Sequence, residues 1–323
     1  MKDVTGNRIT AERYTGDMAD VWNRFVEESR NGTFLHNRGY MDYHSDRFSD
    51  HSLMFYCDGE LIALLPAHMK DGMFCSHNGL TYGGLLLGNN ATAETTLDIF
   101  AALRRHLEER GGVKGIIYRP APHIYHRYPC EEDLYALFRN GAILTECKAS
   151  SVIEMSNAIP FRGRRRLTAA MKNRLHIKEE NNFSRFWEIL GERLQSRYGV
   201  SPVHTLEEIE LLHSRFPDNI KLFTVSDDND NILGGTVLYI TGQTVHMQYS
   251  GTTAEGRRTS ALDHLYEHLI GERFTTKRYF DFGISVEDGG NYLNSGLIAY
   301  KERLGGRTIT YDTYTIDLKT TYR

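Results

Sequence analysis

Apolar residues in the first half of the chain recur at helical spacing in some segments and at strand spacing in others. The helical segments predict helices over residues 17–30, 38–48, 92–110 and 131–140. Residues 53–70 are typical of a β-hairpin that turns at Asp58-Gly59, because this dipeptide accepts the positive φ angles of a two-residue turn. Further extended segments are predicted over 80–87, 113–119 and 142–155.

The second half gives the same kinds of element in the same order. A helix is predicted over 183–198, and a second helix begins near Thr205, where Thr205 and Glu208 form a capping box. The later predicted elements are a hairpin at 221–240, a strand at 244–251, a helix at 259–274, a strand at 278–284, a helix at 292–303 and a closing hairpin at 306–318.

Individual residues repeat along with the elements. Arg47-Phe48-Ser49-Asp50 reappears as Arg215-Phe216-Pro217-Asp218, 168 positions later, and the same offset separates His36 from His204. We therefore predict two related domains, over 1–158 and 159–323, each of ordinary size. Strands with helices between them favour an α/β (α+β) fold, and we expect each domain to be a mixed, mostly antiparallel sheet flanked by helices.

Composition narrows the class of protein. The 323 residues are 40% hydrophobic and 25% charged, as in soluble globular proteins, and the net charge of −4 provides no global basic field for nucleic acid. Four cysteines without CxxC spacing indicate reduced thiols and a cytoplasmic protein. The first residues do not resemble a signal peptide, and no apolar run approaches the roughly 18–20 residues of a membrane helix.

One junction differs between the two halves. Residues 251–261 join a strand to a helix and carry glycine, arginine, threonine and serine, which suit an anion at a helix N-terminus. The equivalent segment, 88–94, has no basic residue. Only the second copy is therefore predicted to bind an anionic ligand; the alternative is an exposed turn that caps a helix.

This junction resembles the GNAT acyltransferase superfamily, in which a splayed strand ends in a loop that wraps the pyrophosphate of acyl-CoA. The resemblance implies that acyl-CoA, such as acetyl-CoA, is held by Gln248, Gly256, Arg257, Arg258, Thr259, Ser260, Ala261 and Asn294. Asn294, the segment Lys301–Gly306 and the phrases LTYGGL, HMQYS and FDFGIS are similar to a narrower group. These are the double-GNAT proteins related to FemABX aminoacyltransferases and FemAB-like acetyltransferases.

The resemblance implies an N-acyltransferase that moves an acyl group from acyl-CoA to an amine, for example of a peptidoglycan or polysaccharide precursor. The donor would bind the second domain and the acceptor would lie between the domains. Two alternatives remain open: an aminoacyl-tRNA-dependent FemABX-type enzyme, and a non-catalytic, degenerate GNAT module. The absence of a long heptad arm disfavours tRNA as the donor.

Four residues are candidates for the chemistry. His246 and Gln248 alternate on one strand and are expected to share a face, with Tyr249 on the other face. His246 suits a general base and Tyr249 an acid for the leaving thiolate; hydrogen bonding in the sheet and packing are the alternatives. Asp281 is expected to orient or deprotonate the acceptor amine, or to form a structural ion pair. Lys301 is implied by the resemblance to act in acyl transfer.

Further residues are candidates for substrate binding. Tyr82 and Gly83 are expected to line an acceptor site, because glycine lets a ligand approach the backbone. A basic run from Arg162 to Lys178 includes Arg164 and Arg165 and suits a phosphorylated acceptor or a tRNA backbone; a solvated surface or ion pairs are the alternatives. We expect no metal site.

Overall fold

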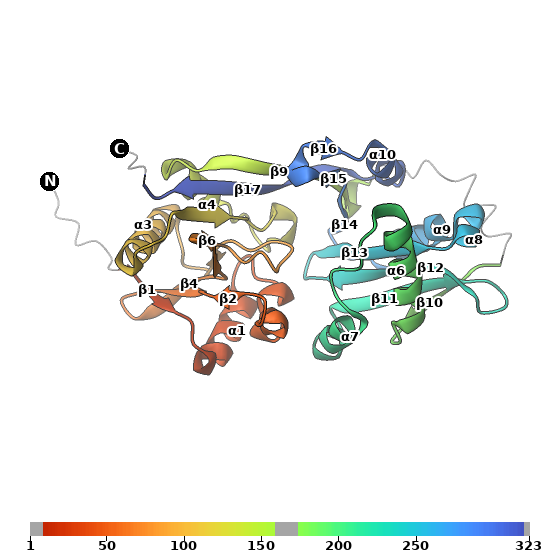
Figure 1. Ribbon diagram of the computed structural model, residues 1–323, viewed down its shortest axis with the longest axis horizontal. Coiled ribbons are helices and arrows are strands. Elements are labelled where there is room, and N and C mark those ends of the chain that lie inside the picture. The colour runs from red at the N-terminus through yellow and green to blue at the C-terminus, as the bar shows by residue number, and fades with distance from the viewer. Residues whose placement is uncertain (1–8, 159–173, 320–323) are drawn as a thin grey trace. The chain divides into compact units, whose positions relative to one another are not determined.

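The computed structural model describes residues 9–158 and 174–319 and divides the chain into two compact units (Figure 1). Unit 1 is Met1–Cys147 with Thr310–Arg323, and unit 2 is Lys148–Ile309. The division differs from the predicted boundary at 158/159 because two long strands, β9 (Ile143–Glu154) and β17 (Arg307–Asp317), each begin in one unit and end in the other. The final strand thus returns to unit 1.

Unit 1 contains two sheets. The first has the order β1-β3-β4-β7 and the second includes β17-β8-β6-β5-β2. The predicted turn is confirmed, since Asp58 and Gly59 both have positive φ and Cys57 pairs with Glu60. The strands are β1 Ile9–Arg13, β2 Ser49–Asp50, β3 Leu53–Cys57, β4 Glu60–Leu65, β5 His68–Lys70, β6 Met73–Cys75, β7 Leu86–Leu87 and β8 Gly115–Tyr118.

The helices of unit 1 pack their apolar faces on these strands. They are α1 Ala19–Glu28, α2 Arg38–Met41, α3 Ala93–Arg110 and α4 Glu132–Arg139. Ile99, Phe100 and Leu103 of α3 form one buried cluster with Phe55 and Ile116 of the sheets. The helix predicted over 38–48 is shorter: α2 ends at Met41 and a 3-10 turn continues to His44.

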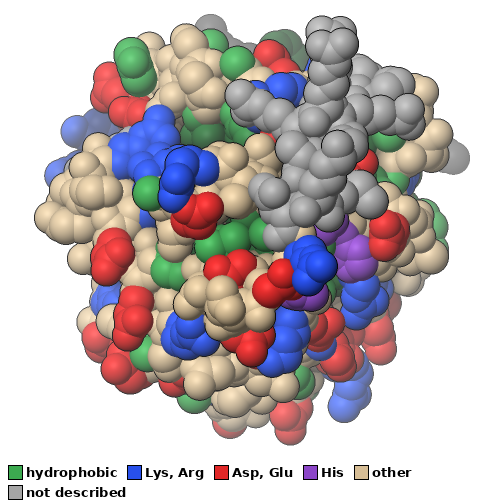
Figure 2. Space-filling model, turned by 90° about the vertical axis from the view of Figure 1, so that its right-hand side faces the viewer, with side chains coloured by type: hydrophobic (Ala, Val, Ile, Leu, Met, Phe, Trp, Pro, Cys, Tyr) green, Lys and Arg blue, Asp and Glu red, His purple; other side chains and the backbone are tan. Residues whose placement is uncertain are grey.

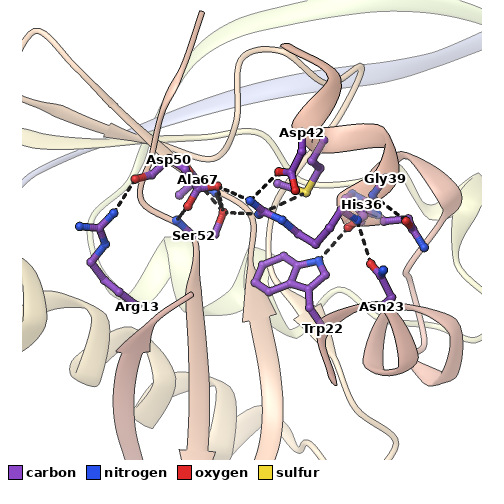
Figure 3. Close-up of polar contacts among 12 residues, drawn as sticks. Arg13, Trp22, Asn23, His36, Gly39, Asp42, Asp50, Ser52 and Ala67 are labelled. Carbon is purple, nitrogen blue, oxygen red and sulfur yellow. Dashed lines mark hydrogen bonds and ion pairs between the residues drawn. The ribbon is translucent and has the colours of Figure 1, made fainter. Parts of the chain in front are cut away.

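Arg38, a buried arginine, joins α2 to the strands of unit 1. Figure 3 shows the surroundings of this contact, including Asp42 and Asp50. The Arg38 guanidinium forms ion pairs with Asp42 at 2.7 Å and Asp50 at 2.9 Å, and lies over the Tyr14 ring at 3.8 Å. Trp22 donates its indole N–H to a main-chain carbonyl of the same region. A buried guanidinium is stable only when its charge is paired in this way, so Arg38 is part of the scaffold.

Unit 2 is built on a sheet with the order β10-β11-β12-β13-β14-β9. Its strands are β10 His176–Glu180, β11 Ile220–Ser226, β12 Ile232–Ile240, β13 Thr244–Thr252 and β14 Tyr279–Ile284, with a small hairpin of β15 Val286–Glu287 and β16 Tyr292–Leu293. The pairs are antiparallel except β13–β14, which is parallel.

Helices cover both faces of this sheet. They are α6 Ser184–Tyr198, α7 Leu206–Arg215, α8 Ala254–Thr259, α9 Ala261–His268 and α10 Ser295–Arg303. Figure 1 shows α6 lying across one face of the sheet. Leu265 and Leu269 pack with Leu238 and Phe280 in the buried cluster on the other face. The capping box predicted at Thr205 and Glu208 is present.

Two departures from regular pairing shape β13. A bulge at Gln248 shifts the register, so that Leu238 faces Met247 while Val237 faces Tyr249. The parallel pairing with β14 runs only from Thr244 to His246. Beyond that point the two strands separate, which leaves main-chain groups of β13 open toward β14.

Further predicted elements differ from the structure. The helix predicted over 259–274 is interrupted: α8 ends at Thr259, Ser260 adopts a left-handed conformation, α9 follows, and a π-helical turn covers Leu269–Arg273. The closing hairpin predicted over 306–318 is the single strand β17, because Arg307–Asp317 is continuous strand without a turn. No helix in the described ranges is long and apolar enough to cross a membrane.

Candidate active site

A buried histidine–aspartate pair marks the point where β13 and β14 separate. His246 is the last residue of β13 that pairs with β14, and its partner in the register is Asp281. His246 Nδ1 lies 2.7 Å from Asp281 Oδ2, and Asp281 is fully buried. The His246 side chain retains 10% exposure. The structure therefore brings together two residues that the sequence placed on separate strands.

Asp281 is held by two further donors. Ser150 Oγ donates to Oδ1 at 2.7 Å, and the Gly283 main-chain N–H donates to the same oxygen at 2.8 Å. Hydrogen bonds of this kind stabilise a buried carboxylate in its charged form. The His246 Nδ1 proton then points at Asp281, which leaves Nε2 as the nitrogen with a lone pair. Such an imidazole can accept a proton from a substrate.

Lys301 lies beside this pair. Its ammonium group donates to the main-chain carbonyls of Gly283 at 2.8 Å and Ile284 at 2.7 Å, and only 2% of the residue is exposed. Burial lowers the pKa of Lys301 to about 8, against an opposing effect of the Asp281 charge. Because Gly283 also contacts Asp281, these residues form one cluster in unit 2.

Tyr249 does not join that cluster, and the bulge changes where it points. Cross-strand partners share a face, and Tyr239 and Val237 pair with His246 and Tyr249, so these last two residues share a face. The sequence pattern predicted opposite faces because it assumed strict alternation. Tyr249 packs against Trp187 and hydrogen-bonds His204, and burial raises its pKa to about 12.

The contact between Tyr249 and His204 has a counterpart in unit 1. His36, 168 positions before His204, lies 5.7 Å from the ring of Tyr82, and His204 lies 5.8 Å from the ring of Tyr249. Tyr82 is buried, donates to Thr33 and stacks on another tyrosine. Each tyrosine therefore packs against the histidine of its own half of the chain. The neighbouring Gly83 is buried too, and a Cβ there would lie 2.4 Å from a main-chain oxygen.

The predicted anion-binding loop is a short helix. Thr253 caps α8, and Gly256 is buried in it, where a Cβ would lie 2.1 Å from the Leu233 carbonyl. Arg257 donates to the Thr252 carbonyl and Arg258 pairs with Glu255, and both arginines are exposed. Thr259 bonds back to the carbonyls of its own helix. These residues form a compact turn rather than an open glycine loop.

The residues that would contact the acyl-bearing arm of acyl-CoA differ from those that would contact its diphosphate. The open edge of β13 beyond His246 suits an extended acyl-bearing arm, and the Gln248 Oε1 atom there is buried without a partner among the described residues. The first turn of α9, which begins at Ala261 directly after Ser260, instead holds the buried carboxylate of Asp263, 3.6 Å from the Arg303 guanidinium. This carboxylate already occupies the positive end of the helix dipole. The N-terminus of α9 therefore does not provide the diphosphate site that the sequence predicted.

The remaining predicted residues have other positions. Asn294 caps α10 by accepting from the Leu297 N–H. Arg164 and Arg165 lie outside the described residues. From the same basic run, Arg174 and Lys178 are exposed and pair with Asp228 and Glu180. On the face in Figure 2, acidic and basic side chains are interspersed among the residues drawn in colour. No group of three metal-ligating side chains occurs within the described ranges.

The sequence pattern missed Ser150 and Gly283. Ser150 lies in a strand that the prediction assigned to the first domain, so nothing connected it with Asp281. Gly283 has φ of +72°, a conformation that favours glycine, and its position after Asp281 was the available signal.

A family model matches part of the second half of the chain. Residues 161–302 match the family model described as an acetyltransferase (GNAT) domain. No curated protein matches the chain. This segment therefore belongs to the GNAT acetyltransferases.

Solved structures extend the likeness to the whole chain. The structure of FemX superposes with a TM-score of 0.67 at 12% identity, covering 95% of this chain and 97% of that chain. L-PGS from Bacillus licheniformis gives 0.61 at 11% identity, covering 94% and 91%. A tandem GNAT protein from the clavulanic acid biosynthesis pathway gives 0.50 at 11% identity, covering 98% and 99%. The protein thus has the FemX-like tandem-GNAT fold.

Proposed function

We propose that unit 2 is an N-acyltransferase that moves an acyl group to the amine of an acceptor, with His246 as the general base. The observation that supports this most directly is the buried His246–Asp281 pair, with Lys301 beside it, where β13 and β14 separate. In this proposal the donor carbonyl lies at that separation. Family membership supports the class of reaction.

The residues of the site account for each proton and charge in the transfer. His246 Nε2 takes a proton from the attacking amine, and Asp281 stabilises the imidazolium that forms. Lys301 opposes the negative charge on the donor carbonyl oxygen as the C–N bond forms. His246 then returns the proton to the leaving thiolate or hydroxyl as the donor bond breaks. We assign Tyr249 to the scaffold, since its contacts are with Trp187 and His204 rather than with the His246–Asp281 pair.

We propose acyl-CoA as the donor, held along the open edge of β13, with exposed Arg257 as a partner for its phosphates. The acceptor class we propose is an amine of a peptidoglycan or polysaccharide precursor. A second candidate donor, aminoacyl-tRNA, is favoured by one observation. Asp263, which pairs with Arg303, already occupies the N-terminus of α9 where the diphosphate of acyl-CoA was expected.

The test uses the full chain with acetyl-CoA and longer acyl-CoAs against amino sugars, diamino acids and their precursors. Thiol release and the mass of the acylated amine are measured together. We expect turnover with at least one pair, and a loss of about 10²–10⁴-fold in kcat in His246→Asn. His213→Asn is the matched control, because His213 bonds the Ile220 carbonyl in another part of unit 2.

The alternatives give different results in the same experiment. An aminoacyl-tRNA donor predicts no thiol release, but salt-sensitive tRNA binding that weakens when Arg164 and Arg165 are neutralised. A non-catalytic module predicts binding of an acyl-CoA or amine without turnover. Equal activity in His246→Asn and the wild type would contradict the proposed base.

A further inference from the structure

We infer that Ser150 is a positioning residue of the proposed acyl transfer, acting on His246 through Asp281. The inference rests on the proposed function, because it concerns the same base. Ser150 lies on β9, on the opposite side of β14 from His246. The carboxylate of Asp281 is therefore held from both neighbouring strands.

The sheet register explains how Ser150 reaches the carboxylate. Val152 is the cross-strand partner of Asp281, so their side chains share a face, and Ser150 lies two residues along the same face. The register is irregular between Asp281 and Ile284, and Ile284 pairs with Ser150. Gly283, in the left-handed conformation within this irregularity, turns its N–H toward Asp281.

Ser150 acts on His246 because the two oxygens of the Asp281 carboxylate have different partners. Oδ2 accepts from His246, while Oδ1 accepts from Ser150 and Gly283. A carboxylate fixed at Oδ1 cannot rotate away from His246, so the Nδ1 proton stays in place and Nε2 keeps its lone pair. Ser150 is fully buried and directs its hydroxyl to Asp281. This arrangement does not suit a nucleophile, which would bond the base.

Ser150 also connects the site to the crossover between units. β9 begins in unit 1 and enters unit 2 at Lys148, so Ser150 is the third residue of the strand within unit 2. The matched family segment begins at residue 161 and does not contain it. A GNAT domain limited to that segment would lack this hydrogen bond.

The neighbouring serine provides a matched control. Ser151 is also fully buried, but its hydroxyl has no hydrogen-bond partner among the described residues. Ser150→Ala and Ser151→Ala therefore remove the same atom from adjacent positions of one strand. Ser150→Thr keeps the hydroxyl and serves as the rescue variant.

The experiment records imidazole ¹⁵N spectra of the full-length protein without substrate, with the His246 signals assigned by their loss in His246→Asn. In the wild type and in Ser151→Ala we expect a single tautomer, with the proton on Nδ1. In Ser150→Ala we expect the Nδ1 and Nε2 signals to move toward each other as the tautomers mix. Ser150→Thr is expected to restore the wild-type signals.

Kinetics give a second readout where turnover with acetyl-CoA or another acyl-CoA is found. Ser150→Ala is expected to lower kcat about tenfold with KM unchanged, as for an impaired base. An unchanged tautomer in Ser150→Ala, or the same change in Ser151→Ala, overturns the inference even if His246→Asn is inactive. An active His246→Asn overturns the proposed base instead, so the two failures are distinguishable.

Discussion

Lys301 and Lys277 are two lysines of unit 2 with similar partners and different surroundings. Each donates its ammonium protons to two main-chain carbonyls, those of Gly283 and Ile284 for Lys301 and those of Thr241 and Gly242 for Lys277. Burial lowers the pKa of both. Only Lys301 lies beside the Asp281 carboxylate. Comparing the two lysines therefore distinguishes the effect of burial on the pKa from a role in acyl transfer.

The two lysines are expected to respond differently to removal of the charge. Lys301→Met should lower kcat about 10²–10³-fold, because it removes the positive charge opposite the developing oxyanion. Lys277→Met should leave kcat unchanged within about twofold, since it alters only a turn. Steady-state acyl transfer by the two variants is the measurement. Equal losses in both variants would contradict the role of Lys301.

The lowered pKa of Lys301 sets a pH limit. With a pKa of about 8, the ammonium form is present at pH 7 and is lost as the pH rises through 8. If the charge is needed, kcat/KM falls with a basic limb near pH 8. The pH profile of the full-length enzyme checks this. A plateau that extends to pH 10 would show that the neutral amine suffices.

Buried histidines of unit 1 make its stability depend on pH. Burial lowers the pKa of His77 to about 2, and those of His51, His68 and His126 to about 4. The unfolded chain takes up protons below about pH 6.5, whereas the folded chain does so only near these lower values. Stability is therefore full above pH 6.5 and decreases as the pH falls toward 4.

A single substitution tests this dependence. His77 has φ of +46°, which asparagine also accepts, so His77→Asn removes a titrating group while keeping the backbone conformation. The acid-unfolding midpoint, followed by circular dichroism, should move to lower pH in His77→Asn. His176→Asn, at an exposed position, should leave the midpoint where it is.

At the scale of elements, α8 is a segment that the sequence predicted as an open loop and that packing holds as a helix. Its sequence, Ala254–Thr259, contains the glycine and arginines that favoured an open anion-binding loop. The Thr253 cap and the close approach of Gly256 to Leu233 fold it into a helical turn instead. The glycine is needed for contact between backbones, not for contact with a ligand.

Two helical glycines give opposite predictions. Gly256→Ala places a Cβ against the Leu233 carbonyl and should destabilise the protein by about 1–3 kcal/mol. Gly191→Ala, in the interior of α6, meets no atom within 4 Å and should stabilise it by about 0.5–1 kcal/mol. Urea unfolding of both variants measures the difference. Destabilisation by Gly191→Ala would contradict the packing described for α6.

At the scale of the whole molecule, the repeat can be read from the sequence, whereas the crossing of β9 and β17 from one unit to the other cannot. The repeat is visible as paired residues, and both His36 and His204 pack against a tyrosine, Tyr82 and Tyr249 respectively. The crossing of β9 and β17 is not visible in the sequence, because each strand reads as part of its own half. Because of this crossing, Ser150 belongs to unit 2, although the sequence predicted it in the first domain.

Fragments that differ only by the crossing strand test this boundary. The fragment 148–309 keeps the β9 residues that pair with β14, and the fragment 159–309 does not. The longer fragment is expected to resist proteolysis and to melt at a higher temperature, since it retains the strand beside β14 and the Ser150 hydrogen bond. Equal stability of the two fragments would contradict this boundary.

The sequence by itself determined the elements and their repetition. The α3 helix, the hairpin turn at Asp58-Gly59 and the cap at Thr205 follow from spacing and local backbone preferences, which act over a few residues. The resemblance also singled out Lys301, and the strand patterns singled out His246 and Asp281.

Only the tertiary structure decided how these residues meet. The bulge at Gln248 reversed the face of Tyr249, and the interrupted pairing of β13 with β14 placed His246 at the point of separation. The same structure joined Ser150 to Asp281 across 131 positions of sequence. Strand register and crossover depend on contacts between distant segments, so no local pattern in the sequence contains them.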